Sequence, residues 1–134
     1  MWAVLCPICA AEVETVNHVF FSCEMAMDLR AMVARWWQVD IPILSCMAEW
    51  TNWIDTARVT TAVRKCLEAV SLALCWAIWC FRNKLLFDET KPVKAYIWDH
   101  IQAQSFLWIN SRTLKFRVFW VDWVCNPYFS INFL

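Results

Sequence analysis

Four potential zinc ligands lie within the first 23 residues, and they constrain the fold more than any other feature of the sequence. Cys6 and Cys9 form a C-x2-C pair, and His18 and Cys23 form an H-x4-C pair. Structural Zn²⁺ is bound by four Cys or His side chains in a tetrahedron. The C-x2-C turn directs two thiolates to one point in space, and the second pair closes the site from another piece of chain. The spacing therefore predicts a small zinc knuckle over residues 1–24.

The alternative interpretation is a set of buried core thiols beside an unrelated histidine, because free Cys often packs as a small hydrophobic residue. However, one of the two histidines of the chain lies between the C-x2-C pair and Cys23, in a segment too short to form a core. We therefore expect one structural Zn²⁺ bound by Cys6, Cys9, His18 and Cys23. Four protein ligands leave no open position at the metal, so the predicted site is structural and not hydrolytic.

The remainder of the chain is predicted to be mainly α-helical. Glycine is absent, so long helices meet few breakers. Apolar residues recur at helical spacing, and this pattern predicts helices at 24–37, at 45–55 with Ser45 as N-cap, at 60–86 and at 93–113. The segment 88–92 is the clearest linker. The expected fold class is therefore mainly α, with the zinc knuckle followed by a bundle of amphipathic helices.

The 11 tryptophans are expected to lie mostly in the core, since side chains at helical spacing more often pack inside than stack on bases. In the helix at 60–86, Trp76 is assigned to the buried face and Ser71 to the wetter side. We expect residues 25–134, a Trp-rich helical region, to pack with the knuckle as one domain.

Apolar residues make up 61% of the chain, whereas about 45–50% is usual. The longest apolar stretch, 69–81, is shorter than the roughly 20 residues of a membrane-spanning helix, so a buried helix and no membrane contact are expected. The N-terminus has no basic region typical of a signal peptide. We therefore expect reduced thiols in a nuclear or cytoplasmic protein, which self-associates or binds a protein partner through its apolar surface.

The net charge of zero conceals an uneven distribution, because residues 1–50 sum to −4 and residues 51–134 to +4. Phosphate binding depends on cationic side chains. The densest basic group is Arg112, Lys115 and Arg117, and it is the candidate contact for weak binding of RNA or DNA. Three such charges are also typical of an ordinary solvated surface.

Other candidate residues carry weaker patterns. Glu14 could orient a zinc ligand or lie in solvent, and both interpretations stay open. A second metal site from Cys75, Cys80 and His100 is disfavoured, since the spacing of the two thiols places them on different faces of a helix. The chain has two histidines and one of them is assigned to zinc, so the sequence shows no Ser-His-Asp or Cys-His arrangement for nucleophilic catalysis. We therefore expect no catalytic residues and no enzymatic activity.

Two motifs carry a resemblance to a known family. Cys6-Pro7-Ile8-Cys9, followed by Glu14 and then His18-Val19-Phe20-Phe21-Ser22-Cys23, resembles the zinc-binding region after the polymerase domain of plant LINE-type (non-LTR) retrotransposon proteins. That region has a CPxC turn, an acidic residue and H-x-F-x-x-C. Trp76-Ala77-Ile78-Trp79, with Arg82-Asn83 and Phe87, is similar to the family's tryptophan-rich helix and its R-N pair.

The resemblance implies a C-terminal module of a retrotransposon-type reverse transcriptase. The polymerase domain, which carries the RNA-directed DNA polymerase activity of the family, is not among these residues. The implied role is to assist nucleic-acid engagement or to dock on the polymerase part of the parent protein. The alternative is a protein-interaction module, or a non-functional remnant, with no nucleic-acid role.

Overall fold

The computed structural model describes residues 4–90, 92–112 and 117–132. Within these residues the chain forms helices and a single isolated β-bridge, so the predicted mainly α fold is confirmed. The elements are a π-helical turn, η1 (His18–Ser22), and the α-helices α1 (Glu24–Trp37), α2 (Met47–Thr56), α3 (Thr61–Phe87), α4 (Ala95–Arg112), α5 (Trp120–Cys125) and α6 (Pro127–Asn132).

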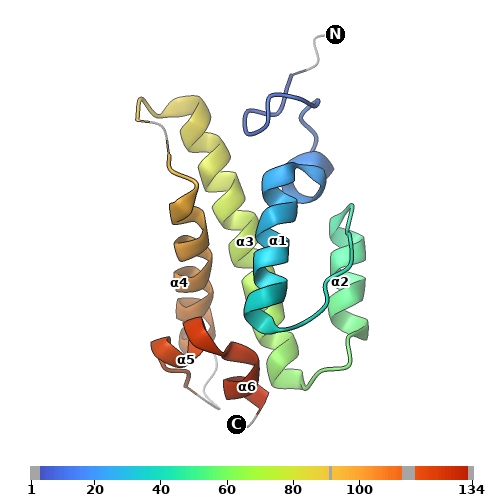
Figure 1. The fold of residues 1–134 in the computed structure, drawn as a ribbon, viewed down its shortest axis with the longest axis vertical. Helices are drawn as coiled ribbons and strands as arrows, with labels where there is room; N and C mark the ends of the chain where they lie inside the picture. Colours follow the sequence, from blue (N-terminus) through green and yellow to red (C-terminus); the bar gives the residue numbers. More distant parts are fainter. Residues whose placement is uncertain (1–3, 91, 113–116, 133–134) are drawn as a thin grey trace.

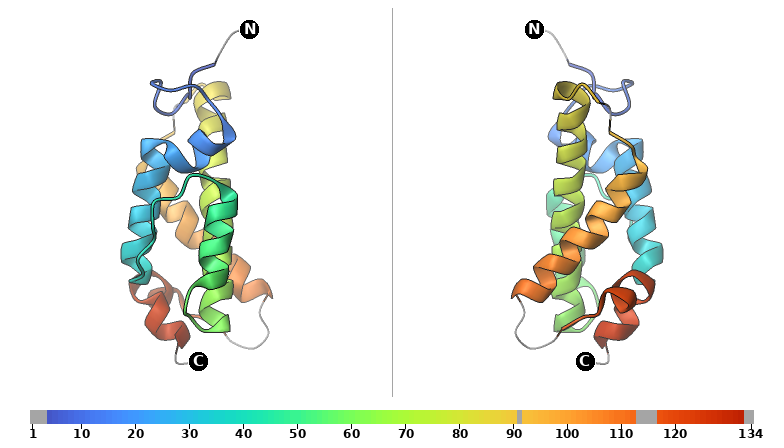
Figure 2. Two further views of the ribbon diagram at one scale, coloured as in Figure 1. Left: turned by 90° about the vertical axis from the view of Figure 1, so that its right-hand side faces the viewer. Right: turned by 90° about the vertical axis from the view of Figure 1, so that its left-hand side faces the viewer.

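The helices pack as an elongated bundle around α3 (Figure 1). Helix α4 runs back along α3, and this pair makes the most extensive helix–helix contact. Helix α1 lies in front of α3 in the view of Figure 1. Helix α2 lies alongside α3 and contacts it (Figure 2). The N-terminal knuckle lies at one end of the bundle and the short helices α5 and α6 cover the opposite end. The knuckle is therefore placed at one end of the elongated molecule.

Helix α3 supplies the largest share of the core. The apolar stripe expected from its periodicity is buried, and it includes Val63, Leu67, Val70, Leu74, Ile78 and Phe81. Thr60 caps the helix, because its hydroxyl accepts a hydrogen bond from the Val63 N–H at 3.2 Å. Two assignments on this helix were wrong: Ser71 is buried and Trp76 is 51% exposed. The exposure of a side chain on α3 depends on which other elements cover that part of the helix, and the local pattern does not reveal this.

Four tryptophans join α1 to the C-terminal half of the chain. Trp36 contacts the rings of Trp37, Trp98 and Trp123 edge-to-face, with centroid separations of 5.4–5.9 Å. The Trp36 Nε1–H donates to the Trp123 carbonyl at 2.7 Å, which satisfies a polar group that would otherwise be buried without a partner. The expected placement of tryptophans in the core is confirmed for this cluster, whereas Trp79 and Trp120 are, like Trp76, partly exposed.

The helix ends follow local capping chemistry. Helix α1 ends at Trp37 because Gln38 adopts a left-handed conformation, with φ of 56°. Helix α2 begins two residues after Ser45, so the expected N-cap role of Ser45 was wrong. The Ser45 backbone N–H and hydroxyl instead donate to the Glu49 carboxylate at 2.8 and 2.9 Å. Pro127 opens α6, a position where its missing N–H costs nothing.

Helix α3 also meets the length and composition criteria of a membrane span. It has 27 residues, and its most apolar 18-residue window has a mean hydropathy of 1.3 with 39% of that window buried. A core helix passes the same test, so one such helix is weak evidence. The absence of membrane contact stays a prediction.

Candidate metal centre

The first two ligands are held by a miniature hairpin at residues 4–14. The Cys6 N–H donates to the Glu12 carbonyl at 2.8 Å, and the Glu14 N–H donates to the Val4 carbonyl at 2.7 Å. Between these two bridged segments the chain turns through Cys9, and the Ala10 N–H closes the turn on the Cys6 carbonyl at 2.8 Å. The C-x2-C turn therefore has its own backbone hydrogen bonds, which bring both thiols to one side of the hairpin.

Ala10 adopts a left-handed backbone conformation, with φ of 56°. This conformation is unfavourable for a residue that has a Cβ, and it favours glycine. The turn therefore carries local strain at the residue directly after Cys9.

The last two ligands are brought together by the π-helical turn η1. The Cys23 N–H donates to the His18 carbonyl at 2.7 Å, which is the five-residue hydrogen bond of a π-turn. This bond explains why an H-x4-C spacing closes the site. The Thr15 hydroxyl accepts from the His18 N–H at 3.0 Å and fixes the start of the turn. Cys23 then leads directly into α1 as its N-cap residue.

The four predicted ligands converge on one site. The Sγ atoms of Cys6, Cys9 and Cys23 and a ring nitrogen of His18 all lie within 4.8 Å of one another. The Cys9 Sγ and the His18 Nε2 are 3.3 Å apart. Tetrahedral zinc, with Zn–S of about 2.3 Å, requires ligand separations of about 3.5–3.8 Å. The group could therefore hold a metal ion after small side-chain adjustments.

The site is largely closed to solvent. Cys6 and Cys23 are fully buried, His18 is buried, and Cys9 is partly exposed at the edge. Burial raises the pKa of the Cys23 thiol to about 11. By contrast, a hydrogen bond from the Ala11 backbone N–H lowers the pKa of the Cys9 thiol to about 6. A divalent cation would supply the positive charge that favours the thiolate form of the buried cysteines.

Ser22 is a supporting residue that the sequence analysis missed. Its Oγ lies 3.1 Å from the His18 Nδ1, on the side of the ring away from Cys9. A histidine that binds metal through one nitrogen is normally oriented by a hydrogen bond from the other. With Nδ1–H donating to Ser22, Nε2 is left free to bind the metal. The i, i+4 spacing of His18 and Ser22 was the sequence signal for this contact.

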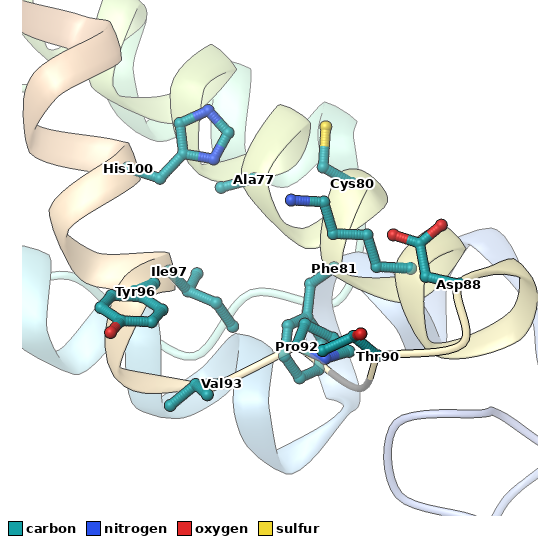
Figure 3. A pocket seen from close by; sticks show the side chains of 11 residues that line it. Ala77, Cys80, Phe81, Asp88, Thr90, Pro92, Val93, Tyr96, Ile97 and His100 are labelled. Atoms are coloured by element: carbon teal, nitrogen blue, oxygen red, sulfur yellow. The ribbon is translucent and has the colours of Figure 1, made fainter.

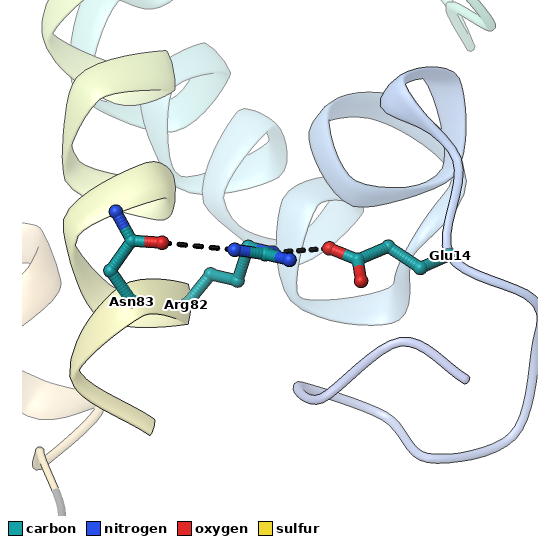
Figure 4. A network of polar contacts seen from close by, with 3 residues as sticks. All are labelled: Glu14, Arg82 and Asn83. Carbon is teal, nitrogen blue, oxygen red and sulfur yellow. Dashed lines mark hydrogen bonds and ion pairs between the residues drawn. The ribbon is translucent and has the colours of Figure 1, made fainter. Parts of the chain in front are cut away.

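An ion pair attaches the knuckle to α3 (Figure 4). The Arg82 Nε donates to the Glu14 carboxylate, and Arg82 Nη1 donates to the Asn83 Oδ1 at 2.9 Å. The guanidinium also lies 4.8 Å from the centroid of the Trp79 ring. The side chains of Arg82 and Glu14 are each 17% exposed. Glu14 thus contacts a helix residue, and neither of its two proposed roles describes this arrangement.

Other candidate residues are not assembled into a comparable site. Cys80 and His100 line a hollow of 350 Å³ between α3 and α4 (Figure 3). Among the described residues, the group that includes Cys6 is the one set of three or more metal-binding side chains close enough to share an ion. The hollow therefore does not support a second metal site.

The basic candidates lie near the C-terminal end of α4. Arg112 is the last residue of that helix and is exposed, and Arg117 is exposed five residues later. The Arg117 Nη1 donates to the Asn110 carbonyl at 3.3 Å. Lys115 lies outside the described residues.

Comparisons with protein-family models, curated proteins and solved structures find no match to this chain. The fold and the site define a helical protein with an N-terminal Cys3His group that could bind metal.

Proposed function

We propose that the chain is a structural zinc module that belongs to a retrotransposon-type reverse transcriptase. The main support is that the potential ligand atoms of Cys6, Cys9, His18 and Cys23 all lie within 4.8 Å of one another. Three thiolates and one imidazole are a ligand set typical of structural zinc. The resemblance of the sequence motifs supports the family assignment. The contact of Glu14 with Arg82 also supports it, because it gives the acidic residue and the R-N pair of that pattern one shared physical role.

A structural role for the metal follows from the way the knuckle is built. Four protein ligands complete a tetrahedron, so the bound ion has no position for a substrate. The hairpin at residues 4–14 contributes few side chains to the core, and the exposed fraction is 66% for Val4 and 50% for Val13. Metal binding must therefore supply much of the order of this segment, as it does in other small zinc units.

The structural role can be tested by amide hydrogen exchange on the zinc-loaded protein. In Cys9→Ser, residues 4–23 should lose protection while α3 and α4 keep theirs. Cys46→Ser serves as the matched control, because Cys46 lies far from the site in sequence and is not one of the four clustered residues. Unchanged exchange at residues 4–23 in the Cys9→Ser variant would show that the metal does not organise the knuckle.

The nucleic-acid role is proposed to be weak and to lie away from the metal. The acidic charge of residues 1–50 repels a phosphate backbone, whereas the second half of the chain is basic. Changing Arg112, Lys115 and Arg117 together to Gln should remove most binding of a labelled single strand, measured by fluorescence anisotropy across a salt series. Glu12→Gln should leave binding unchanged or make it slightly stronger, because it removes one repelling charge. Tight binding that survives the triple change and is lost on zinc chelation would place the contact at the knuckle instead.

A protein-interaction module is the second candidate, and the surface of α3 favours it. Leu72, Trp76 and Trp79 follow one another at helical spacing and are 55%, 51% and 40% exposed. Leu86 and Phe87 extend the same apolar face and are 48% and 77% exposed. Large apolar side chains exposed together on one helix face typically mark a protein–protein contact. Either the rest of a parent polymerase or another copy of the chain could cover it.

A further inference from the structure

Arg30 is a buried cation on the inner side of α1. Only 6% of the residue is exposed. Its guanidinium carbon lies 4.1 Å from the centroid of the Phe21 ring and 4.7 Å from that of Trp50. One terminal nitrogen, Nη1, donates to the Phe20 carbonyl. Burial lowers the pKa of Arg30 to about 10, so the group stays charged at neutral pH.

This cation has no carboxylate partner among the described residues, and burial raises the pKa of the neighbouring Cys75 thiol, which keeps that group neutral. The ion pair found there joins Arg82 to Glu14, and no carboxylate lies within ion-pair distance of Arg30. The Arg30 Nε is buried without a hydrogen-bond partner, and so is the Trp50 Nε1 of the same neighbourhood. Buried charges in proteins are normally paired with an opposite charge. The described residues therefore give the Arg30 guanidinium one neutral acceptor, the Phe20 carbonyl, and no negatively charged one.

A cavity of 210 Å³ lies beside Arg30, between α1 and the loop at residues 41–44. Apart from Arg30, its lining is entirely apolar. Phe21, Arg30 and Leu44 are its buried residues, whereas Met27 and Ile43 are exposed and mark the opening. The cavity thus combines one unpaired cation with an apolar wall, and it is smaller than the roughly 300 Å³ at which sites for drug-sized ligands begin.

We propose that this cavity binds a small apolar carboxylic acid, with the carboxylate on Arg30 and the hydrocarbon part against the apolar wall. Arginine presents its N–H donors in a planar fork that matches the two oxygens of a carboxylate. A phosphate is disfavoured, because the cavity has no second cation to balance its charge. An amine would place a second positive charge beside Arg30. The acid could be free in solution or could be the C-terminal carboxylate of a peptide that ends in an apolar residue.

The direct test is a titration of the zinc-loaded full chain with hexanoate, followed by ¹H–¹⁵N NMR. We expect saturable shifts centred on Arg30 and residues 41–44. Hexanol, which has the same chain length but no charge, should bind at least tenfold more weakly. N-acetyl-leucine serves as the peptide-like probe: tighter binding than hexanoate assigns the site to a peptide C-terminus, and weaker binding assigns it to a free acid. Equal affinity for hexanoate and hexanol, or no saturation with either acid, would overturn the proposal.

Variants separate recognition by Arg30 from its role in packing. Ala31→Trp should fill the mouth of the cavity and abolish hexanoate binding without altering Arg30, because Ala31 lines the cavity and is exposed. Arg30→Met should abolish the preference for hexanoate over hexanol. Arg35→Met, at an exposed arginine of the same helix, should preserve it. If Arg30→Met does not fold, Ala31→Trp still decides, since hexanoate binding that survives in this variant would place the acid elsewhere.

Discussion

At the scale of single residues, the metal centre depends as much on the groups around the ligands as on the ligands themselves. Ala10 holds the strained turn after Cys9, and Ser22 holds the imidazole of His18. Neither side chain is one of the four metal ligands. Ala10 instead fixes the backbone beside Cys9, and Ser22 fixes the ring orientation of His18. The residue-scale predictions therefore concern affinity for zinc and not the number of ions bound.

Ala10→Gly should bind zinc a few-fold more tightly than the unaltered chain. Removing the Cβ relieves a left-handed conformation that costs about 1–2 kcal/mol, and the greater freedom of glycine in the unfolded state offsets part of this gain. Ala10→Val should bind about tenfold more weakly, because a β-branched residue fits this conformation worse than alanine does. Competition with a chromophoric chelator measures both. Equal affinities for the three chains would contradict the φ of 56° at this position.

Ser22→Ala should weaken zinc binding by about tenfold, since loss of a group that orients a metal-binding histidine typically costs 10–100-fold in affinity. Ser111→Ala is the control, because the Ser111 hydroxyl bonds locally to the Trp108 carbonyl at 3.2 Å, far along the chain from the knuckle. The same chelator competition applies. An unchanged affinity in Ser22→Ala would mean that the contact with Nδ1 does not orient the ring.

The ligands could be predicted from the sequence, whereas the contacts between distant residues that support the site could not. The C-x2-C and H-x4-C spacings identify Cys6, Cys9, His18 and Cys23, because a tetrahedral ion imposes short loops between its ligands. The contact of Glu14 with Arg82 joins residues 68 positions apart, and no local spacing encodes it. Burial of Arg30 likewise depends on the packing of Phe21 and Trp50 around it.

At the scale of elements, the knuckle and α3 are joined by charge and by ring contacts. Arg82 bonds to Glu14 and stacks on Trp79, which in turn packs on Phe20 of η1 at a centroid distance of 6.3 Å. The second contact ties the π-turn to the same helix surface. We therefore expect α3 to limit the local opening of the knuckle.

Arg82→Gln should increase amide exchange across residues 4–23 by about tenfold, which corresponds to about 1.4 kcal/mol of local stability. The ion pair is mostly shielded from solvent, so this effect should exceed the few tenths typical of exposed pairs. Lys84→Gln is the control on the same helix, because Lys84 is exposed and is not ion-paired in the described part of the chain. Equal exchange in both variants would show that the ion pair does not restrain the knuckle.

Long elements were easier to predict than short ones. Helix α1 has the bounds expected from its apolar periodicity, and α3 starts and ends within one residue of its expected range. A stripe that repeats over several turns gives a strong signal. Helices α5 and α6 have six residues each, too few for a period to emerge, and they depend on Trp123 and Ile131 packing into the core.

At the scale of the whole molecule, the apolar face of α3 predicts self-association. The chain combines 61% apolar residues with a partly exposed stripe at Leu72, Trp76 and Trp79. The double variant Leu72→Glu, Trp76→Glu should shift the sedimentation profile toward monomer at high concentration. Val121→Glu, which places one such charge at an exposed apolar residue of another helix, should not. A chain that is monomeric before any change would remove the basis for this prediction.

The most direct test of the central claim is the metal content and ligand set of the purified protein. After refolding with equimolar zinc under reducing conditions, elemental analysis should find about one zinc per chain. X-ray absorption should find about three sulfur neighbours near 2.3 Å and one nitrogen near 2.0 Å. Cys66→Ser, a change at a buried thiol outside the site, should retain both results. A protein that remains free of zinc, or whose zinc is bound by oxygen neighbours, would contradict the assignment of Cys6, Cys9, His18 and Cys23 as a zinc centre.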